Sequence, residues 1–168
     1  MSEKDLRAML AYASDYAERR FAKKGQLVGM WHAITSKGEN IVEPGPPCDK
    51  DTAVAIIRAM FEIRDVVRYV FFDEAWTLYK LIQPDEMTRI NRDGLASHPE
   101  RVEVVMFQGE DAEWGQITAQ RLIHRPAHGK PYLGPLEMLN ELAHFPRGAA
   151  LQSEGRMVGL LPVRGSKQ

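Results

Sequence analysis

Apolar residues recur at steps of three and four positions in two stretches of the N-terminal half, which is the spacing of a helix with one buried face. From Leu6 to Phe21 they form a single stripe, and basic residues fill the last turn before Gly25, a residue type that often ends helices. The second stripe runs from Ala53 to Phe61, after Asp49 or Asp51, either of which can cap the helix start. We therefore predict two amphipathic helices.

Strand patterns separate and follow these helices. Residues 66–72 are β-branched and aromatic with hardly a polar interruption, which predicts a central strand with both faces covered. Weaker alternation and turn residues predict two hairpins, with strands at 27–34, 39–42, 101–107 and 115–124 and a turn at 109–111. Because the apolar positions of 115–124 do not alternate cleanly, a helix stays an alternative there.

Residues 77–99 form a long polar connection between the central strand and the second hairpin, and Pro84, Gly94 and Pro99 interrupt it. A short helix is predicted within it, at 85–91. Connections of this length are uncommon in compact domains and are often mobile or functional.

The C-terminal part has weaker patterns. Residues 126–135 have the composition of a loop, and Pro135 suits the first position of a third helix that ends near Pro146. The apolar positions of this predicted helix are Leu136, Leu139, Leu142 and Ala143. Residues 157–161 are a candidate edge strand, and residues 164–168 are expected to fray.

The order of elements is therefore helix, hairpin, helix, strand, connection, hairpin, helix. The strands of a hairpin are antiparallel, and the helices need an apolar surface on which to pack. This combination predicts a two-layer α+β fold, with helices packed on a mostly antiparallel or mixed sheet. The length of 168 residues fits one domain over 1–163 followed by a short tail.

Composition agrees with an ordinary globular protein. Hydrophobic residues make up 44% of the chain, which is enough for one core and too much for a disordered chain. Lys and Arg number 22 against 23 Asp and Glu, so the formal net charge is -1. This balance does not indicate nucleic acid as a partner. Arg121, Arg125 and Lys130 are candidates for contact with phosphates, and Trp114 for stacking on a base, but three scattered cations in a neutral protein are more often a solvated face.

Other residues bear on the compartment. The single cysteine, Cys48, excludes an internal disulfide, and no stretch approaches the roughly 18 consecutive apolar residues that cross a bilayer. The first ten residues lack the apolar run of a signal peptide. We expect a cytoplasmic protein with Cys48 reduced and inert, and with no membrane partner.

A metal-assisted hydrolase is one hypothesis, with Glu74, His98 and Glu103 as its catalytic residues. These three flank the two clearest strands, and carboxylates and imidazole can bind a divalent metal or act as acid and base. Asp73 precedes Glu74 on a strand, so the two carboxylates point to opposite faces. A solvated strand end and a loop histidine are the competing interpretations.

No other chemistry is strongly indicated. His124 and His128 have a metal-pair spacing, but Pro126 between them prevents a helical turn. The nucleophile-elbow, dinucleotide and P-loop motifs are absent from the sequence, and we predict no cofactor.

A non-enzymatic interaction or accessory module, with a homodimer as one form, is the preferred hypothesis. Aromatic residues beyond the core stripes suggest a surface for a protein partner or a second copy, with Tyr69, Trp76, Tyr79 and Tyr132 as its candidates. The candidate binding residues are Trp31, His32, Trp76 and Arg101.

Three short strings are shared with a known group of sequences. Trp31 in the first strand, residues 72–76 after the central strand and residues 97–101 before the next strand together resemble small uncharacterised bacterial and phage-associated proteins. No activity is attached to that group. The resemblance implies a single α+β domain and nothing about chemistry.

Overall fold

The structure is a computed structural model, and it describes residues 3–140 and 159–162. Three α-helices, a 3-10 helix and seven strands follow one another along the chain. They are α1 (Glu3–Lys24), β1 (Met30–Thr35), β2 (Asn40–Pro44), α2 (Lys50–Ile63), β3 (Val66–Thr77), α3 (Pro84–Asp93), η1 (Leu95–Ser97), β4 (Val102–Asp111), β5 (Gly115–His124), β6 (Tyr132–Leu133) and β7 (Glu137–Asn140).

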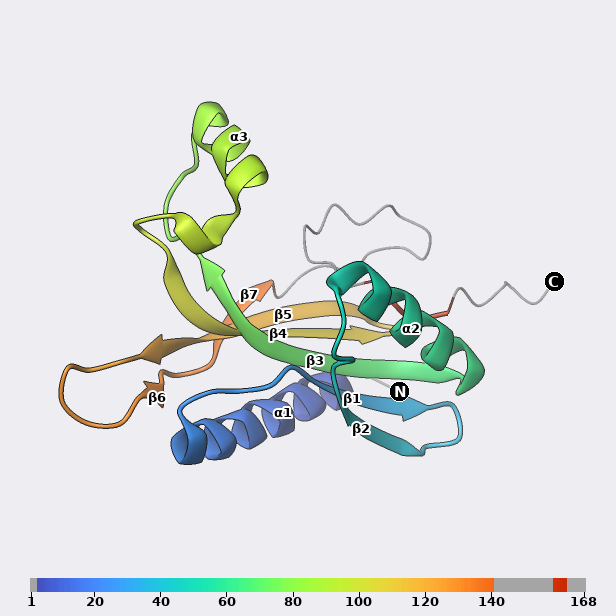
Figure 1. Ribbon diagram of the computed structural model, residues 1–168. Coiled ribbons are helices and arrows are strands. Elements are labelled where there is room, and N and C mark those ends of the chain that lie inside the picture. The colour runs from blue at the N-terminus through green and yellow to red at the C-terminus, as the bar shows by residue number, and fades with distance from the viewer. Residues whose placement is uncertain (1–2, 141–158, 163–168) are drawn as a thin grey trace.

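A single antiparallel sheet organises the described residues (Figure 1). The strand order is β2-β1-β3-β4-β5-β6, and every observed pair is antiparallel. β6 pairs with the end of β5, at residues 123–124, while β7 pairs with its middle, at residues 118–120. The predicted α+β class, with helices packed on an antiparallel sheet, is confirmed.

The sheet has a helix on each face, so the elements form three layers and not the two that were predicted, and β3 contributes to both cores. Val70 and Phe72 point toward α1, while Tyr69 and Phe71 point toward α2. All seven residues of 66–72 are buried. The predicted central strand with two covered faces is therefore confirmed, because neither side of this segment meets solvent.

Both predicted amphipathic helices are present. The buried side of α1 runs from Leu6 to Phe21, and Gly25 ends the helix with a φ of +68° while its N–H bonds to the carbonyl of Phe21. Asp49 is the N-cap of α2, since its carboxylate accepts a hydrogen bond of 3.0 Å from the N–H of Thr52. Among the described residues, none of the helices combines the length and the apolar character that crossing a membrane requires.

The predicted turn at 109–111 is wrong, because β4 continues through these residues and the turn occupies 112–114. Asp111 fixes the later position. Its Oδ1 accepts hydrogen bonds from the N–H groups of Glu113 and Trp114, at 2.8 and 3.0 Å. The strand predicted at 115–124 is confirmed as β5.

The predictions for residues 132–140 are wrong at two places. Residues 137–140 form strand β7 instead of the start of a helix, because the outer edge of β5 offers them backbone partners. Tyr132 and Leu133 form β6 within the predicted loop. Residues 159–161 are not in a strand, and the rest of the predicted third helix, of the edge strand and of the tail lies outside the described residues.

Candidate functional site

The connection between β3 and β4 stands off from the sheet (Figure 1), and we call residues 76–101 the arm. It contains α3, which includes the short helix predicted at 85–91, and η1. No residue of α3 is buried. At the base of the arm the Arg101 guanidinium lies 5.9 Å from the centroid of the Trp76 ring, so a cation–π contact joins its two ends.

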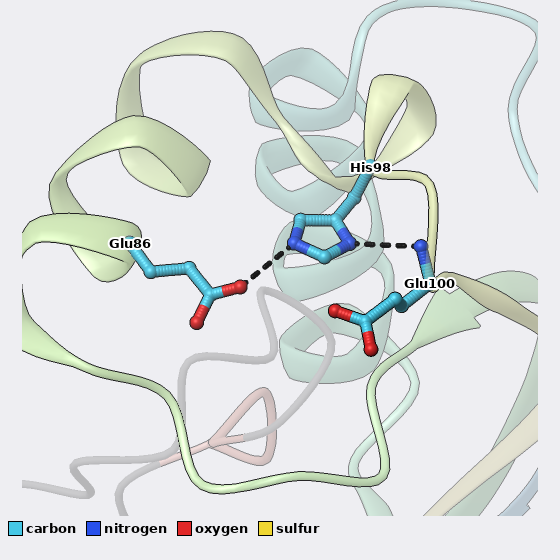
Figure 2. A group of neighbouring side chains, drawn as sticks. All are labelled: Glu86, His98 and Glu100. Atoms are coloured by element: carbon cyan, nitrogen blue, oxygen red, sulfur yellow. Dashed lines mark hydrogen bonds and ion pairs between the residues drawn. The ribbon is translucent and has the colours of Figure 1, made fainter.

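A polar cluster of His98, Glu86, Glu100 and Lys80 lies inside the arm. Figure 2 shows the His98 ring between the two carboxylate residues. His98 Nε2 is 2.9 Å from Oε1 of Glu86, and His98 Nδ1 accepts a hydrogen bond of 3.1 Å from the N–H of Glu100. Because Nδ1 accepts, the ring proton resides on Nε2 and is donated to Glu86.

Lys80 completes this cluster by bridging both carboxylates. Its Nζ lies 2.5 Å from Glu100 Oε2 and 2.8 Å from Glu86 Oε1. The hydrogen bonds to Glu100 and Glu86 raise the pKa of Lys80. Those from Lys80 and His98 lower the pKa of Glu86. The network holds α3 to the residues that lead into β4.

The same cluster has the composition of a cation site. One ligand atom each from Glu86, His98 and Glu100 can be chosen so that all three lie within 4.8 Å of one another. These residues border a hollow of about 300 Å³ that Arg89, Asp93 and Ser97 also line. A metal ion bound there would replace the Nε2 proton and the Lys80 ammonium.

A second, smaller hollow of about 160 Å³ lies at the open end of β3 and β4, on the face of the sheet that α1 covers. Trp76 pairs with Glu103 in the register of β3 and β4, and Glu74 lies two residues before Trp76, on the same face of β3. Oε1 of Glu74 accepts a hydrogen bond of 2.7 Å from Leu27 N–H, and Glu103 pairs with Arg125 Nε at 2.6 Å. Both carboxylates therefore stabilise the chain around the end of α1.

The structure thus divides the predicted catalytic residues between two places. Glu74 and Glu103 line the smaller hollow, and His98 lines the hollow of the arm. The three-residue group with metal-ligand geometry in residues 3–140 and 159–162 is Glu86, His98 and Glu100. Glu74, His98 and Glu103 do not converge on one ion, because the arm carries His98 away from the strand face that bears the two carboxylates.

Asp73 points to the opposite face from Glu74, as predicted. An ideal Cβ on Gly29 would lie 3.0 Å from the Asp73 carboxylate, so glycine leaves room there for this side chain. Burial raises the pKa of Asp73, and the hydrogen bond from Glu74 N–H opposes that shift.

The predicted binding residues also separate. Trp31 is 1% exposed and packs on Phe61, Tyr69 and Phe71, which places it in the core. His32 hydrogen-bonds to Asn40 across the β1–β2 hairpin. Only Trp76 and Arg101 lie together on the surface, where the arm begins and ends.

Several other candidates have structural explanations. Tyr69 is fully buried, so it cannot belong to a surface. His124 stacks on Tyr132 with ring centroids 4.7 Å apart and not on His128. Arg121 is buried, where its Nε donates to the carbonyl of Gly134 at 2.6 Å and its Nη1 pairs with Glu18. Cys48 is exposed.

Sequence reasoning missed Lys80, Glu86 and Glu100. The only available signals were Glu86 in the first turn of a predicted helix and the step of two positions from His98 to Glu100. Neither signal reveals that Lys80 lies between the two carboxylates.

Comparisons with protein family models, with curated proteins and with solved structures find no match. The resemblance to small bacterial and phage-associated proteins therefore stays a prediction. The residues of the arm and of the adjoining strand ends are the basis for inferring a function.

Proposed function

We propose that this protein is a non-enzymatic interaction module that binds a second copy of itself through residues 76–81, the first part of the arm. The exposure of three large apolar side chains within this short segment carries the proposal. Trp76 is 45% exposed, Tyr79 is 56% exposed and Leu81 is 91% exposed. Complete burial of such a side chain stabilises a complex by about 1.5–3 kcal/mol, and aromatic residues are enriched at interface cores.

Two of these side chains are held in place before any contact forms. The Tyr79 hydroxyl accepts a hydrogen bond from Gln120 and donates to Glu137 at 3.3 Å, which ties it to β5 and β7. Arg101 stacks on Trp76. Side chains that are already ordered lose little conformational entropy on binding, which favours association.

The charges of the arm favour a second copy as the partner. Residues 76–101 contain four cations and four carboxylates. A twofold contact brings the same surface of two molecules together, so an excess of either sign would repel. The balanced arm has no such excess, and it offers no single-sign surface for a strongly charged partner.

Sedimentation equilibrium of the purified protein and two variants tests this proposal. Leu81→Lys introduces a charge into the proposed contact and should give a monomer. Ile63→Lys is the matched control, because Ile63 is 82% exposed at the end of α2 and outside the arm. A monomeric wild-type protein, or a dimer that both variants disrupt equally, contradicts the proposal.

Metal-assisted hydrolysis is the second candidate, and the close approach of Glu86, His98 and Glu100 favours it. Imidazole and carboxylate are ligands of zinc, and three protein ligands leave a coordination position for water. The open hollow beside these side chains would admit a substrate. Lys80 opposes this function, because its ammonium group already neutralises both carboxylates.

Thermal unfolding with and without zinc tests whether the cluster is a metal site or a salt-bridge network closed by Lys80. A ligand that binds only the folded state raises the stability of that state. If zinc binds, His98→Ala abolishes the stabilisation, and Lys80→Met increases it by removing the competing cation. His128→Ala is the control, because His128 lies on an exposed loop outside the cluster. Equal responses of all variants to zinc would exclude the site.

A further inference from the structure

The polar cluster of the arm already holds a positive charge between its donor atoms. Lys80 Nζ lies 2.5 Å from Oε2 of Glu100 and 2.8 Å from Oε1 of Glu86. The same oxygen of Glu86 is 2.9 Å from Nε2 of His98, and Figure 2 shows the ring between the two carboxylate residues. Glu86 and His98 are largely shielded from solvent. The ammonium group thus occupies a small site that oxygen and nitrogen donors surround.

The same donors suit a divalent metal ion. One ligand atom from each of Glu86, His98 and Glu100 lies within 4.8 Å of the other two. Ligand atoms that share one zinc ion lie about 2 Å from it, and therefore at most about 4 Å from one another, so small side-chain movements bring these three to metal-binding distance. Imidazole and carboxylate are both ligands of zinc. A zinc ion carries twice the charge of Lys80 and competes with it for the same two carboxylates.

Lys80 also belongs to the segment through which the protein is proposed to associate with a second copy. It lies between Tyr79 and Leu81, both of which are exposed. Its ammonium group is directed to Glu86 and Glu100, which neutralise its charge. A displaced Lys80 would extend its flexible stem into solvent beside Leu81. Displacement of the ammonium group by a metal ion therefore changes the charge of the contact surface.

We infer that Glu86, His98 and Glu100 bind zinc in exchange for the Lys80 ammonium group, and that this metal exchange weakens self-association. The inference rests on the proposed contact through residues 76–81. The arm contains four cations and four carboxylates, and zinc adds two positive charges to each copy. In a twofold contact the same excess of charge on both copies is repulsive. By linkage, self-association weakens zinc binding by the same factor.

The metal exchange also moves one proton within the His98 ring. Nδ1 accepts the hydrogen bond from the N–H of Glu100, so the ring proton resides on Nε2. When Nε2 gives its lone pair to zinc, the ring stays neutral by carrying this proton on Nδ1, and the N–H of Glu100 loses its acceptor. Lys80 leaves as the ammonium ion, so no proton is released. The tautomer of His98, which nitrogen NMR reports, is therefore a signature of the metal exchange.

Isothermal titration with zinc, and sedimentation equilibrium with and without zinc, test the inference. Zinc should weaken the wild-type dimer by about tenfold, within the usual range of coupling between two sites. Lys80→Met should bind zinc more tightly, and zinc should weaken its dimer less, because no ammonium group is released into the contact. His98→Ala should lose the response to zinc. Lys37→Met is the matched control, because Lys37 is exposed in the turn between β1 and β2, and it should behave like the wild type.

Three outcomes would overturn the inference. The first is zinc binding that His98→Ala leaves unchanged, and the second is equal affinity of Lys80→Met and the wild type for zinc. The third is a wild-type dimer whose dissociation constant is the same with zinc bound. Failure of the proposed function looks different, because the wild type is then monomeric without zinc. That result removes the effect on self-association, while the Lys80→Met titration and the His98 tautomer still decide whether the metal exchange occurs.

Discussion

The phenol of Tyr69 donates a hydrogen bond of 2.8 Å to Oε2 of Glu110, its partner in the register of β3 and β4. The backbone N–H of Leu160 donates to the same oxygen at 3.1 Å, and the Leu160 side chain is buried in the core beside α2. This one carboxylate thus links strands β3 and β4 to a residue near the end of the chain.

Tyr69→Phe removes a donor to that carboxylate while preserving the ring. We expect a loss of about 1.5–3 kcal/mol in the free energy of unfolding, the usual value of a hydrogen bond to a charged group. Urea denaturation measures this change. Tyr12→Phe is the control, because the Tyr12 ring is mostly exposed and its loss of a hydroxyl should change stability little. Equal effects of both substitutions would contradict the role of the Tyr69 bond.

Glu110 also predicts a pH dependence of stability. Burial raises the pKa of Glu110, and the hydrogen bonds from Tyr69 and Leu160 oppose this shift. The folded protein therefore holds the proton to higher pH than the unfolded chain does, so stability falls as the pH rises above the ordinary glutamate pKa of 4.5. Glu110→Gln should reduce this decline in urea denaturation. An unchanged pH profile would show that Glu110 does not contribute to it.

Asp111 has two structural roles that two substitutions can separate. Its Oδ2 pairs with buried Arg68 at 2.7 Å, while its Oδ1 accepts the two turn hydrogen bonds. Asp111→Ala removes both interactions and leaves the Arg68 charge, among the described residues, with a 3.7 Å contact to Asp5, so we expect a loss of about 3–5 kcal/mol in stability. Asp111→Asn retains the acceptor for the turn and should destabilise less. Identical melting temperatures for the two variants would show that the turn bonds contribute nothing.

Glu74 is predicted to act as a structural acceptor. Glu74→Ala leaves the N–H of Leu27 without its partner and should lower the free energy of unfolding by about 1–3 kcal/mol. Glu74→Gln retains an acceptor oxygen and should lower it less. Hydrogen exchange of the Leu27 amide measures the bond directly. Fast exchange in the alanine variant and slow exchange in the glutamine variant support this role. Slow exchange in both would leave Glu74 available for another function.

The sequence predicts those elements whose burial leaves a clear pattern of apolar residues within the segment itself. Residues 66–72 are apolar on both sides except for the buried Arg68, because helices cover both faces of β3. The stripe of α1 is regular because one side of the helix is buried. The irregular pattern of 115–124 also has a cause. Arg121 occupies an inward position of β5 between Ala119 and Ile123, where Gly134 and Glu18 satisfy its guanidinium.

Elements that depend on a distant partner were not predictable in the same way. Leu136 and Met138 pack on the core beside α1. Their spacing of two positions is typical of a strand, whereas the spacing of three from Leu136 to Leu139 is typical of a helix, so the sequence fits both. The free edge of β5 selects the strand, and that edge is not visible in a local pattern.

The candidate site illustrates the same limit. Glu74 and Glu103 line the same hollow at the strand ends, yet their hydrogen-bond partners, Leu27 and Arg125, lie far away in the sequence. His98 was singled out, but its companions Glu86 and Lys80 reach it only because the arm folds back on itself.

An intermolecular distance between spin labels at position 81 tests the proposed self-association most directly. The background substitution Cys48→Ser removes the single native thiol, and Leu81→Cys or Ile63→Cys then places one nitroxide at the proposed contact or on α2. Contact through residues 76–81 predicts a dipolar signal in double electron–electron resonance, with a shorter distance at position 81 than at position 63. The absence of an intermolecular signal at both positions, or a shorter distance at position 63, would contradict it.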